Sequence, residues 1–129
     1  GNLYSKRDWG HAEDYVIAMW KMLQQKNPSD FVICTGKQYT IKQFINFTAK
    51  KLGIKIVWKG RGINEKGFDQ NNNCVIECKS KYFRPAEVDS LKGDYSKAKK
   101  ILNWRPKHNI HSLIDDMIKY EIKNLNNDR

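Results

Sequence analysis

Cysteine is scarce in this chain, and its spacing excludes several kinds of site. The 129 residues include three cysteines, Cys34, Cys74 and Cys78, with no Cys-x-x-Cys pair among them. A structural zinc site needs four closely spaced ligands and a disulfide framework needs an even set, so we expect neither. Cys74 and Cys78 would share one face of a strand but lie too far apart to bond. We therefore expect no metal, and a reduced, cytoplasmic setting.

Long apolar runs are also missing. No stretch approaches the roughly 20 apolar residues that a helix needs to cross a bilayer, and the first residues do not form a signal peptide. We expect no membrane partner. The chain begins at Gly1 without an initiator methionine, which favours a fragment or an excised domain.

The motifs of several enzyme classes are absent from the sequence. No Gly-x-Gly-x-x-Gly fingerprint follows a strand pattern, and there is no P-loop. No Ser/His/Asp or Cys/His set stands out. The histidines His11, His108 and His111 are not spaced as a metal site with nearby carboxylates. We therefore predict a binding domain that has no catalytic residue of its own.

Positive charge is what the chain has in excess. It carries 24 Lys and Arg against 14 Asp and Glu, a net charge of +10. Such a charge favours anionic partners through its long-range field but does not specify a fold. Nucleic acid, an anionic membrane and phosphorylated metabolites stay open on this ground alone. The lysines are scattered, as on a solvated surface.

Apolar spacing predicts a small α/β arrangement within one domain. The helix beginning near Asp14 has a wide apolar face, Thr40 is a candidate N-cap, Gly53 is a candidate helix stop and Asp94 a further cap. Residues 60–73 form the loosest stretch. The patterns place helices at residues 14–23, 40–52, 94–102 and 111–125, and strands at residues 31–35, 54–58 and 75–78.

Two segments combine an arginine with acids and aromatic residues, in or beside a turn. They are Lys6-Arg7-Asp8-Trp9-Gly10-His11-Ala12 and Tyr82-Phe83-Arg84-Pro85-Ala86-Glu87-Val88-Asp89. A guanidinium forks onto phosphate oxygens, and a carboxylate accepts hydrogen bonds from neighbouring hydroxyls. The two segments therefore indicate half of a nucleotide-sugar site.

Most of the chain resembles one enzyme family. The resemblance is to the GDP-mannose 4,6-dehydratases, within the extended short-chain dehydrogenase/reductases, and it runs in order along nearly the whole sequence. Several distinct blocks make it far more specific than a single motif. The blocks are residues 1–16, 18–25, 31–36, 64–67, 82–89 and 93–107.

The resemblance implies a fold and a role. Members of this family have an N-terminal Rossmann part, with NADP and the catalytic Thr, Glu, Tyr and Lys, and a smaller C-terminal part that holds the sugar nucleotide. Residues 1–129 would be that C-terminal GDP-mannose-binding domain, a small mixed α/β fold without the Rossmann domain. The parent enzyme would convert GDP-mannose to GDP-4-keto-6-deoxymannose for GDP-fucose or deoxyhexose biosynthesis. This chain alone would be inactive and would not bind NADP.

Four site residues follow from the matched blocks. Arg7 and Arg84 would bind the GDP diphosphate, and Glu87 would accept hydrogen bonds from the ribose hydroxyls. Asn2 would line the nucleotide pocket. A simpler interpretation pairs Arg7 with Asp8 in a salt bridge at the helix entry.

Two residues depart from the family, and we expect both to be surface or turn changes. Tyr4 stands where the family more often has Asp, and Tyr95 where it often has Pro. The four tryptophans fit a core or a pocket wall better than a base-stacking platform.

Two other functions stay open. One is the same domain from another nucleotide-sugar dehydratase or epimerase. The other is a basic, non-enzymatic nucleic-acid-binding module, although no nucleic-acid-binding motif is present and we expect no nucleic-acid partner. Subunit contacts in the resembled family are made mainly by the missing part, so we predict a monomer or a weak dimer.

Overall fold

The chain forms two compact units, each assembled from segments that are distant in sequence. The computed structural model describes residues 1–84, 86 and 88–127. The first unit comprises Gly1–Lys6 and Tyr39–Ser90, and the second comprises Arg7–Gln38 and Leu91–Arg129. The backbone therefore passes from one unit to the other three times.

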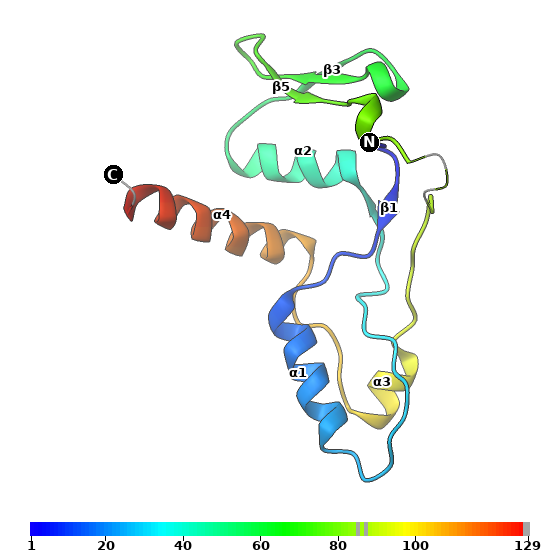
Figure 1. Ribbon diagram of the computed structural model, residues 1–129. Coiled ribbons are helices and arrows are strands. Elements are labelled where there is room, and N and C mark those ends of the chain that lie inside the picture. The colour runs from blue at the N-terminus through cyan, green and yellow to red at the C-terminus, as the bar shows by residue number, and fades with distance from the viewer. Residues whose placement is uncertain (85, 87, 128–129) are drawn as a thin grey trace. The chain divides into compact units, whose positions relative to one another are not determined.

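The first unit is built from one helix and a small antiparallel sheet (Figure 1). Helix α2 (Ile41–Lys51) lies beside the strands β3 (Val57–Lys59), β4 (Lys66–Phe68) and β5 (Cys74–Glu77). The strand order is β3-β4-β5, with Val57 opposite Phe68. Strands were thus predicted in the right regions, although each was displaced by one or more residues.

Residues 60–73 are more structured than the sequence suggested. They contain the short 3-10 helix η1 (Gly62–Asn64) and all of β4, the central strand of the sheet. Gly67 makes this possible, because a methyl group there would lie 3.0 Å from the side chain of Ile56 and 3.2 Å from that of Ile76. Residues 60–73 have the composition of a loop, and for this reason the strand β4 within them was not predicted. Its close packing leaves no room for a side chain at Gly67.

The ends of α2 confirm two predictions. Thr40 Oγ1 accepts a hydrogen bond from Gln43 N at 3.0 Å, and Gln43 Oε1 accepts one from Thr40 N at 2.8 Å. This reciprocal arrangement is a capping box, which satisfies two backbone amides at once. Gly53, just past the helix, has a φ of +72°, a conformation that glycine adopts without strain.

Short elements complete the first unit, except that Arg7, the last residue of β1, belongs to the second unit. Strands β1 (Lys6–Arg7) and β2 (Tyr39–Thr40) form a two-stranded sheet. Lys6 also bridges Ser90 in parallel and donates its backbone N–H to Asp89 O at 2.8 Å. The 3-10 helix η2 (Ser80–Tyr82) leads into the Arg84 segment.

The second unit is helical. Helices α1 (Ala12–Leu23) and α3 (Ser96–Ile101) lie side by side, and α4 (Ile110–Asn127) follows (Figure 1). Trp104 is 3% exposed, and its indole N–H donates to Asp14 O at 2.9 Å. The core cluster comprises Ala18, Ala98, Leu102 and Trp104, with Tyr15, Ile17, Met22, Phe31, Ile33 and Tyr95 packed against it.

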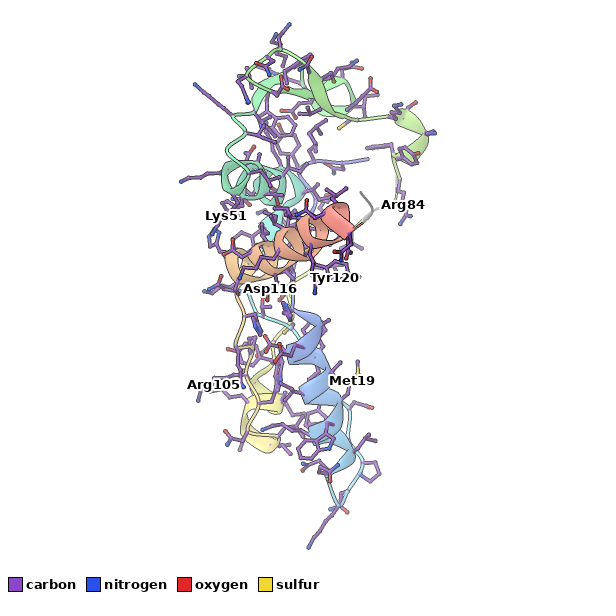
Figure 2. All side chains as sticks on the ribbon, turned by 90° about the vertical axis from the view of Figure 1, so that its left-hand side faces the viewer. Met19, Lys51, Arg84, Arg105, Asp116 and Tyr120 are labelled. Atoms are coloured by element: carbon purple, nitrogen blue, oxygen red, sulfur yellow. The ribbon has the colours of Figure 1, made fainter. Side chains whose placement is uncertain are left out.

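Helix α1 buries less of its apolar surface than predicted. Ala18 is fully buried, but Met19 (labelled in Figure 2) is 58% exposed and Trp20 is 61% exposed. The prediction of one wide buried face is therefore wrong. The helix has two apolar faces, and only one packs on the core. The exposed face consists of Val16, Met19, Trp20 and Leu23, at helical spacing.

No strand is present at residues 31–35, contrary to prediction. Phe31 and Ile33 face the core while Val32 is 54% exposed, so the side chains alternate as in a strand. A strand also needs a neighbour to complete its backbone hydrogen bonds, and no described strand pairs with this segment. Of the described helices, none combines the length and the apolar character needed to span a membrane.

Replacing Trp104 tests which tryptophan supports the fold. Trp104→Ala should lower the free energy of unfolding by about 3–5 kcal/mol, because it leaves a cavity and removes a buried hydrogen bond. Trp20→Ala, on the exposed face of α1, should change it by less than about 0.5 kcal/mol. Urea unfolding followed by circular dichroism measures both. Equal losses in the two variants would contradict this account of the core.

Candidate functional site

A pocket of the first unit brings together two of the predicted site residues. It encloses about 320 Å³ and receives Asn2 from the N-terminal segment and Arg84 from the segment after η2. These residues lie at opposite ends of the unit's sequence, so folding alone makes them neighbours. The pocket is lined by Gly1, Asn2, Leu3, Ile41, Glu77, Cys78, Lys81, Tyr82 and Arg84.

The pocket has a surplus of positive charge. Lys81 and Arg84 are exposed cations on its wall (Arg84 is labelled in Figure 2). Among the lining residues that the structure describes, the one carboxylate is Glu77, and it is paired with Lys66 at 2.8 Å and Lys79 at 3.4 Å. A hydrogen bond from Lys66 lowers the pKa of Glu77, so its charge stays balanced. The pocket therefore suits an anion.

One of the two polar groups of the Asn2 side chain is already hydrogen-bonded within the chain. Its Oδ1 accepts a hydrogen bond from Tyr4 N at 2.9 Å, which closes a tight turn at the start of the chain. The side-chain NH₂ is then the group that can donate to a ligand.

Of the other two predicted site residues, the structure describes only one. Arg7 is half-buried, ends β1 and belongs to the second unit. Glu87 lies outside the residues that the structure describes. The roles predicted for all four residues, Arg7, Arg84, Glu87 and Asn2, remain predictions.

Asp8, which follows Arg7, is an anchor for this part of the chain. Its Oδ1 accepts hydrogen bonds from Thr35 N at 2.8 Å and Thr35 Oγ1 at 2.5 Å, and its Oδ2 accepts one from Gly36 N at 2.8 Å. The segment that carries Arg7 is thereby fixed to residues 35–36. Sequence spacing gave no sign of this contact.

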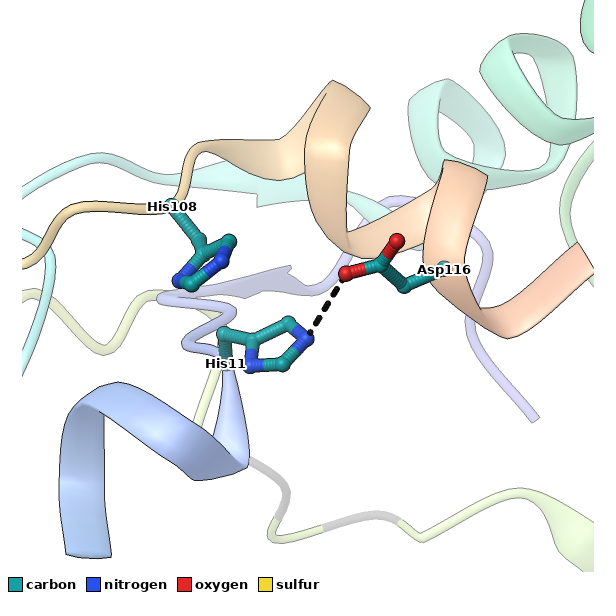
Figure 3. A group of neighbouring side chains, drawn as sticks. All are labelled: His11, His108 and Asp116. Carbon is teal, nitrogen blue, oxygen red and sulfur yellow. Dashed lines mark ion pairs between the residues drawn. The ribbon is translucent and has the colours of Figure 1, made fainter. Parts of the chain in front are cut away.

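Sequence spacing also missed a cluster of His11, His108 and Asp116 (Figure 3). The Nε2 of His11 lies 3.4 Å from Asp116 Oδ2, and the three ligand atoms lie within 4.8 Å of one another. They come from the turn before α1, the loop before α4, and α4 itself. Residues distant in sequence can thus gather where spacing shows no motif.

The geometry of this cluster does not suit a metal ion. The rings of His11 and His108 are stacked, with centroids 4.1 Å apart and planes at 22°. Imidazole binds a metal with a lone pair in the plane of its ring, and stacked rings direct these lone pairs side by side instead of toward one point. In addition, His11 Nδ1 accepts a hydrogen bond from Glu13 N at 3.2 Å, which assigns the proton to Nε2.

The cluster instead connects the start of α1 with α4 and the loop before it, all within the second unit. His11 is the N-cap of α1 and reaches Asp116 of α4, while His108 stacks on it. Asp14, which is 1% exposed, accepts hydrogen bonds from Lys107 N and His108 N at 3.0 and 2.9 Å. Asp14, an acid in the first turn of α1, is therefore a buried partner of the loop before α4.

The two departures from the resembled family have different outcomes. Tyr4 lies in a turn and is 52% exposed, as predicted. Tyr95 is half-buried, and its ring packs edge-on against Trp104 at 5.9 Å, so the prediction of a surface change is wrong there. Tyr95 and Lys99 also have the Tyr-x-x-x-Lys spacing found in dehydrogenases, but packing against the core accounts for this tyrosine.

Comparison with known proteins gives a consistent result. A family model described as GDP-mannose 4,6 dehydratase matches residues 1–117. The GDP-mannose 4,6 dehydratase of Drosophila melanogaster is 49% identical over 124 residues, covering 95% of this chain and 31% of the relative. The GDP-mannose 4,6-dehydratase of Vibrio cholerae is 42% identical over 134 residues, covering 95% and 36%. The chain thus spans about a third of the length of these relatives.

A solved structure has a similar fold. The structure of RMD from Pseudomonas aeruginosa, complexed with NADPH, superposes with a TM-score of 0.64 at 16% sequence identity. The match covers 88% of this chain and 31% of that chain. At this identity the likeness concerns the fold alone, and it confirms the prediction of a small mixed α/β arrangement.

Replacing Asp8 tests its role as an anchor. Asp8→Asn keeps the size of the side chain but turns one acceptor into a donor that faces a backbone N–H. We expect the free energy of unfolding to fall by about 1–3 kcal/mol. Asp30→Asn, at an exposed position, is the matched control and should have little effect. Urea unfolding measures both free energies. Equal stability of Asp8→Asn and the unmodified chain would contradict the role of Asp8 as an anchor.

Proposed function

The chain belongs to the GDP-mannose 4,6-dehydratase family, and from this premise we propose that it is the C-terminal, substrate-binding part of such an enzyme. Residues 1–129 would form a nucleotide-sugar-binding domain that holds the GDP of GDP-mannose. The observation that carries this proposal is the pocket in which Asn2 and Arg84 meet. It combines a net positive wall with an amide donor, as a diphosphate and its attached sugars require.

Each site residue has a stated role in this proposal. Arg84 pairs with the diphosphate, and its planar fork can give two parallel hydrogen bonds. Asn2 donates from the pocket wall. For Arg7 the matched blocks imply a contact with the GDP diphosphate, and for Glu87 they imply acceptance of hydrogen bonds from the ribose hydroxyls. Lys81, on the same wall as Arg84, adds a second positive charge.

The rest of the reaction would come from the part of the enzyme that this chain lacks. An N-terminal Rossmann domain would supply NADP and the catalytic residues, and the whole enzyme would convert GDP-mannose to GDP-4-keto-6-deoxymannose. The exposed face of α1, with Trp20 at 61% and Leu23 at 82% exposure, supports such a partner. An apolar stripe of this kind is normally covered in a complete protein.

A reducing compartment is part of the proposal. All three cysteines are free thiols, which fits the cytoplasm better than an oxidising compartment.

Titration calorimetry tests the nucleotide site directly. The chain should bind GDP and GDP-mannose weakly, because the Rossmann side of the site is absent and the remaining pocket must be ordered on binding. UDP and dTDP should bind less well. Arg84→Ala should abolish the binding of GDP, since it removes the cation that faces the diphosphate. Lys50→Ala, on α2 and outside this pocket, is a control that should leave the affinity unchanged.

The other outcomes separate the remaining functions. A preference for UDP or dTDP would indicate another nucleotide-sugar enzyme. Equal binding of all four nucleotides, with a steep loss at higher salt, would indicate a nucleic-acid-binding module. No binding of any nucleotide would withdraw this support for the pocket.

The oligomeric state is a further test. We expect a monomer or a weak dimer, because the resembled enzymes make their subunit contacts mainly through the missing part. Light scattering after size exclusion measures this, and a stable tetramer would contradict it. Leu23→Glu should reduce any association, since it places a charge on the exposed face of α1. Glu121→Gln, at an exposed position of α4, should not.

A further inference from the structure

An ion pair with a buried carboxylate connects segments of the first unit. Glu65 is 2% exposed, and its Oε1 forms a close ion pair with Lys42 Nζ. Its Oε2 accepts a hydrogen bond from the hydroxyl of Tyr4 at 2.8 Å. Three segments therefore meet at one carboxylate: the N-terminal segment, helix α2 and the residue that precedes β4.

Two aromatic rings lie close to the ammonium group of Lys42, which is partly exposed. Lys42 Nζ lies 4.7 Å from the centre of the Trp58 ring and 5.4 Å from that of Tyr4. The hydrogen bond with Lys42 lowers the pKa of Glu65, and the same contact raises the pKa of Lys42. Both groups thus stay charged, and Glu65 needs its partners because an unpaired buried charge is strongly destabilising.

The pair is connected directly to the pocket. Tyr4 donates its backbone N–H to Asn2 Oδ1, so the turn that includes Asn2 ends at the residue that contacts Glu65. Lys42 N donates to Leu3 O at 2.9 Å, and Ile41 N donates to Ser5 O at 3.2 Å. The first amides of α2 are therefore used to hold the N-terminal segment, and Leu3 and Ile41 both line the pocket.

We propose that Tyr4, Lys42 and Glu65 are positioning residues for the nucleotide pocket. They fix the N-terminal segment on α2 and so hold Asn2 at the pocket wall, although none of the three lines the pocket. This inference rests on the proposed function. It goes further by assigning a binding role to a buried network, one member of which, Tyr4, departs from the resembled family.

Stability alone does not account for such a network. Apolar side chains of similar volume often stabilise a protein as well as a buried ion pair does. An ion pair also fixes the orientation of the groups around it, since the tyrosine hydroxyl and the ammonium group must each contact one carboxylate oxygen. A segment held in this way has one position, which a binding wall requires.

Tyr4→Phe is the primary test, because it removes the hydroxyl and keeps the ring. Calorimetry should show GDP affinity reduced about tenfold, as expected for losing a hydrogen bond to a charged group. Hydrogen exchange followed by NMR should be faster at the amides of Tyr4 and Lys42. Tyr120→Phe, on exposed α4 (Figure 2), is the matched control and should change neither measurement.

A second pair of variants tests the ion pair itself. Lys42→Met should weaken GDP binding, and Lys42→Arg, which keeps the charge, should restore most of it. Circular dichroism confirms that each variant is folded at the temperature of the titration. A variant that exchanges faster but binds GDP with unchanged affinity would overturn the inference, because the network would then serve the fold alone.

The two proposals can fail separately. If Arg84→Ala abolishes GDP binding while Tyr4→Phe and Lys42→Met bind normally, the nucleotide site stands and the positioning role falls. If the unmodified chain binds no nucleotide, the proposed function loses its support. The exchange data then test only the first step of the inference, the fixing of the N-terminal segment on α2: unchanged protection in Tyr4→Phe overturns it, and faster exchange at Tyr4 and Lys42 supports that step alone.

Discussion

Carboxylates that must find donors in distant parts of the chain hold this structure together. Asp8 accepts from residues 35–36, Asp14 from residues 107–108, and Glu65 from Tyr4 and Lys42. Asp14 and Glu65 are buried, and a buried charge left without partners is so unfavourable that each of these two acids effectively determines which segments meet. The apolar core of the second unit is small, and the acids supply the specificity that apolar packing lacks.

Local chemistry could be predicted from the sequence where it depends on neighbouring residues. The capping box of Thr40 and Gln43 and the helix stop at Gly53 involve residues within one turn of each other. Features that depend on a distant partner could not be predicted in this way. The missing strand at residues 31–35 and the burial of Asp14 both follow from which segments lie beside them.

The same distinction, between features of neighbouring residues and features that depend on distant partners, applies to the candidate site. The two arginine-containing blocks were visible as motifs, and the structure places Arg84 with Asn2 in one pocket. The network behind the pocket was not visible, because Tyr4, Lys42 and Glu65 have no common spacing. Likewise, His11 and His108 looked unrelated in the sequence, yet their rings stack. Residue types are enough to recognise candidate binding residues, but the residues that hold them in position can be identified only from the fold.

The threefold passage of the chain between the units has a consequence for biosynthesis. Synthesis runs from the N-terminal to the C-terminal side of a chain, so α1 emerges long before Leu102 and Trp104, on which its core depends. The second unit therefore cannot close until α3 and the segment that carries Trp104 have left the exit tunnel. The first unit, by contrast, can close once Ser90 is available. Vectorial synthesis would thus complete the pocket first and leave α1 exposed to chaperones in the interval.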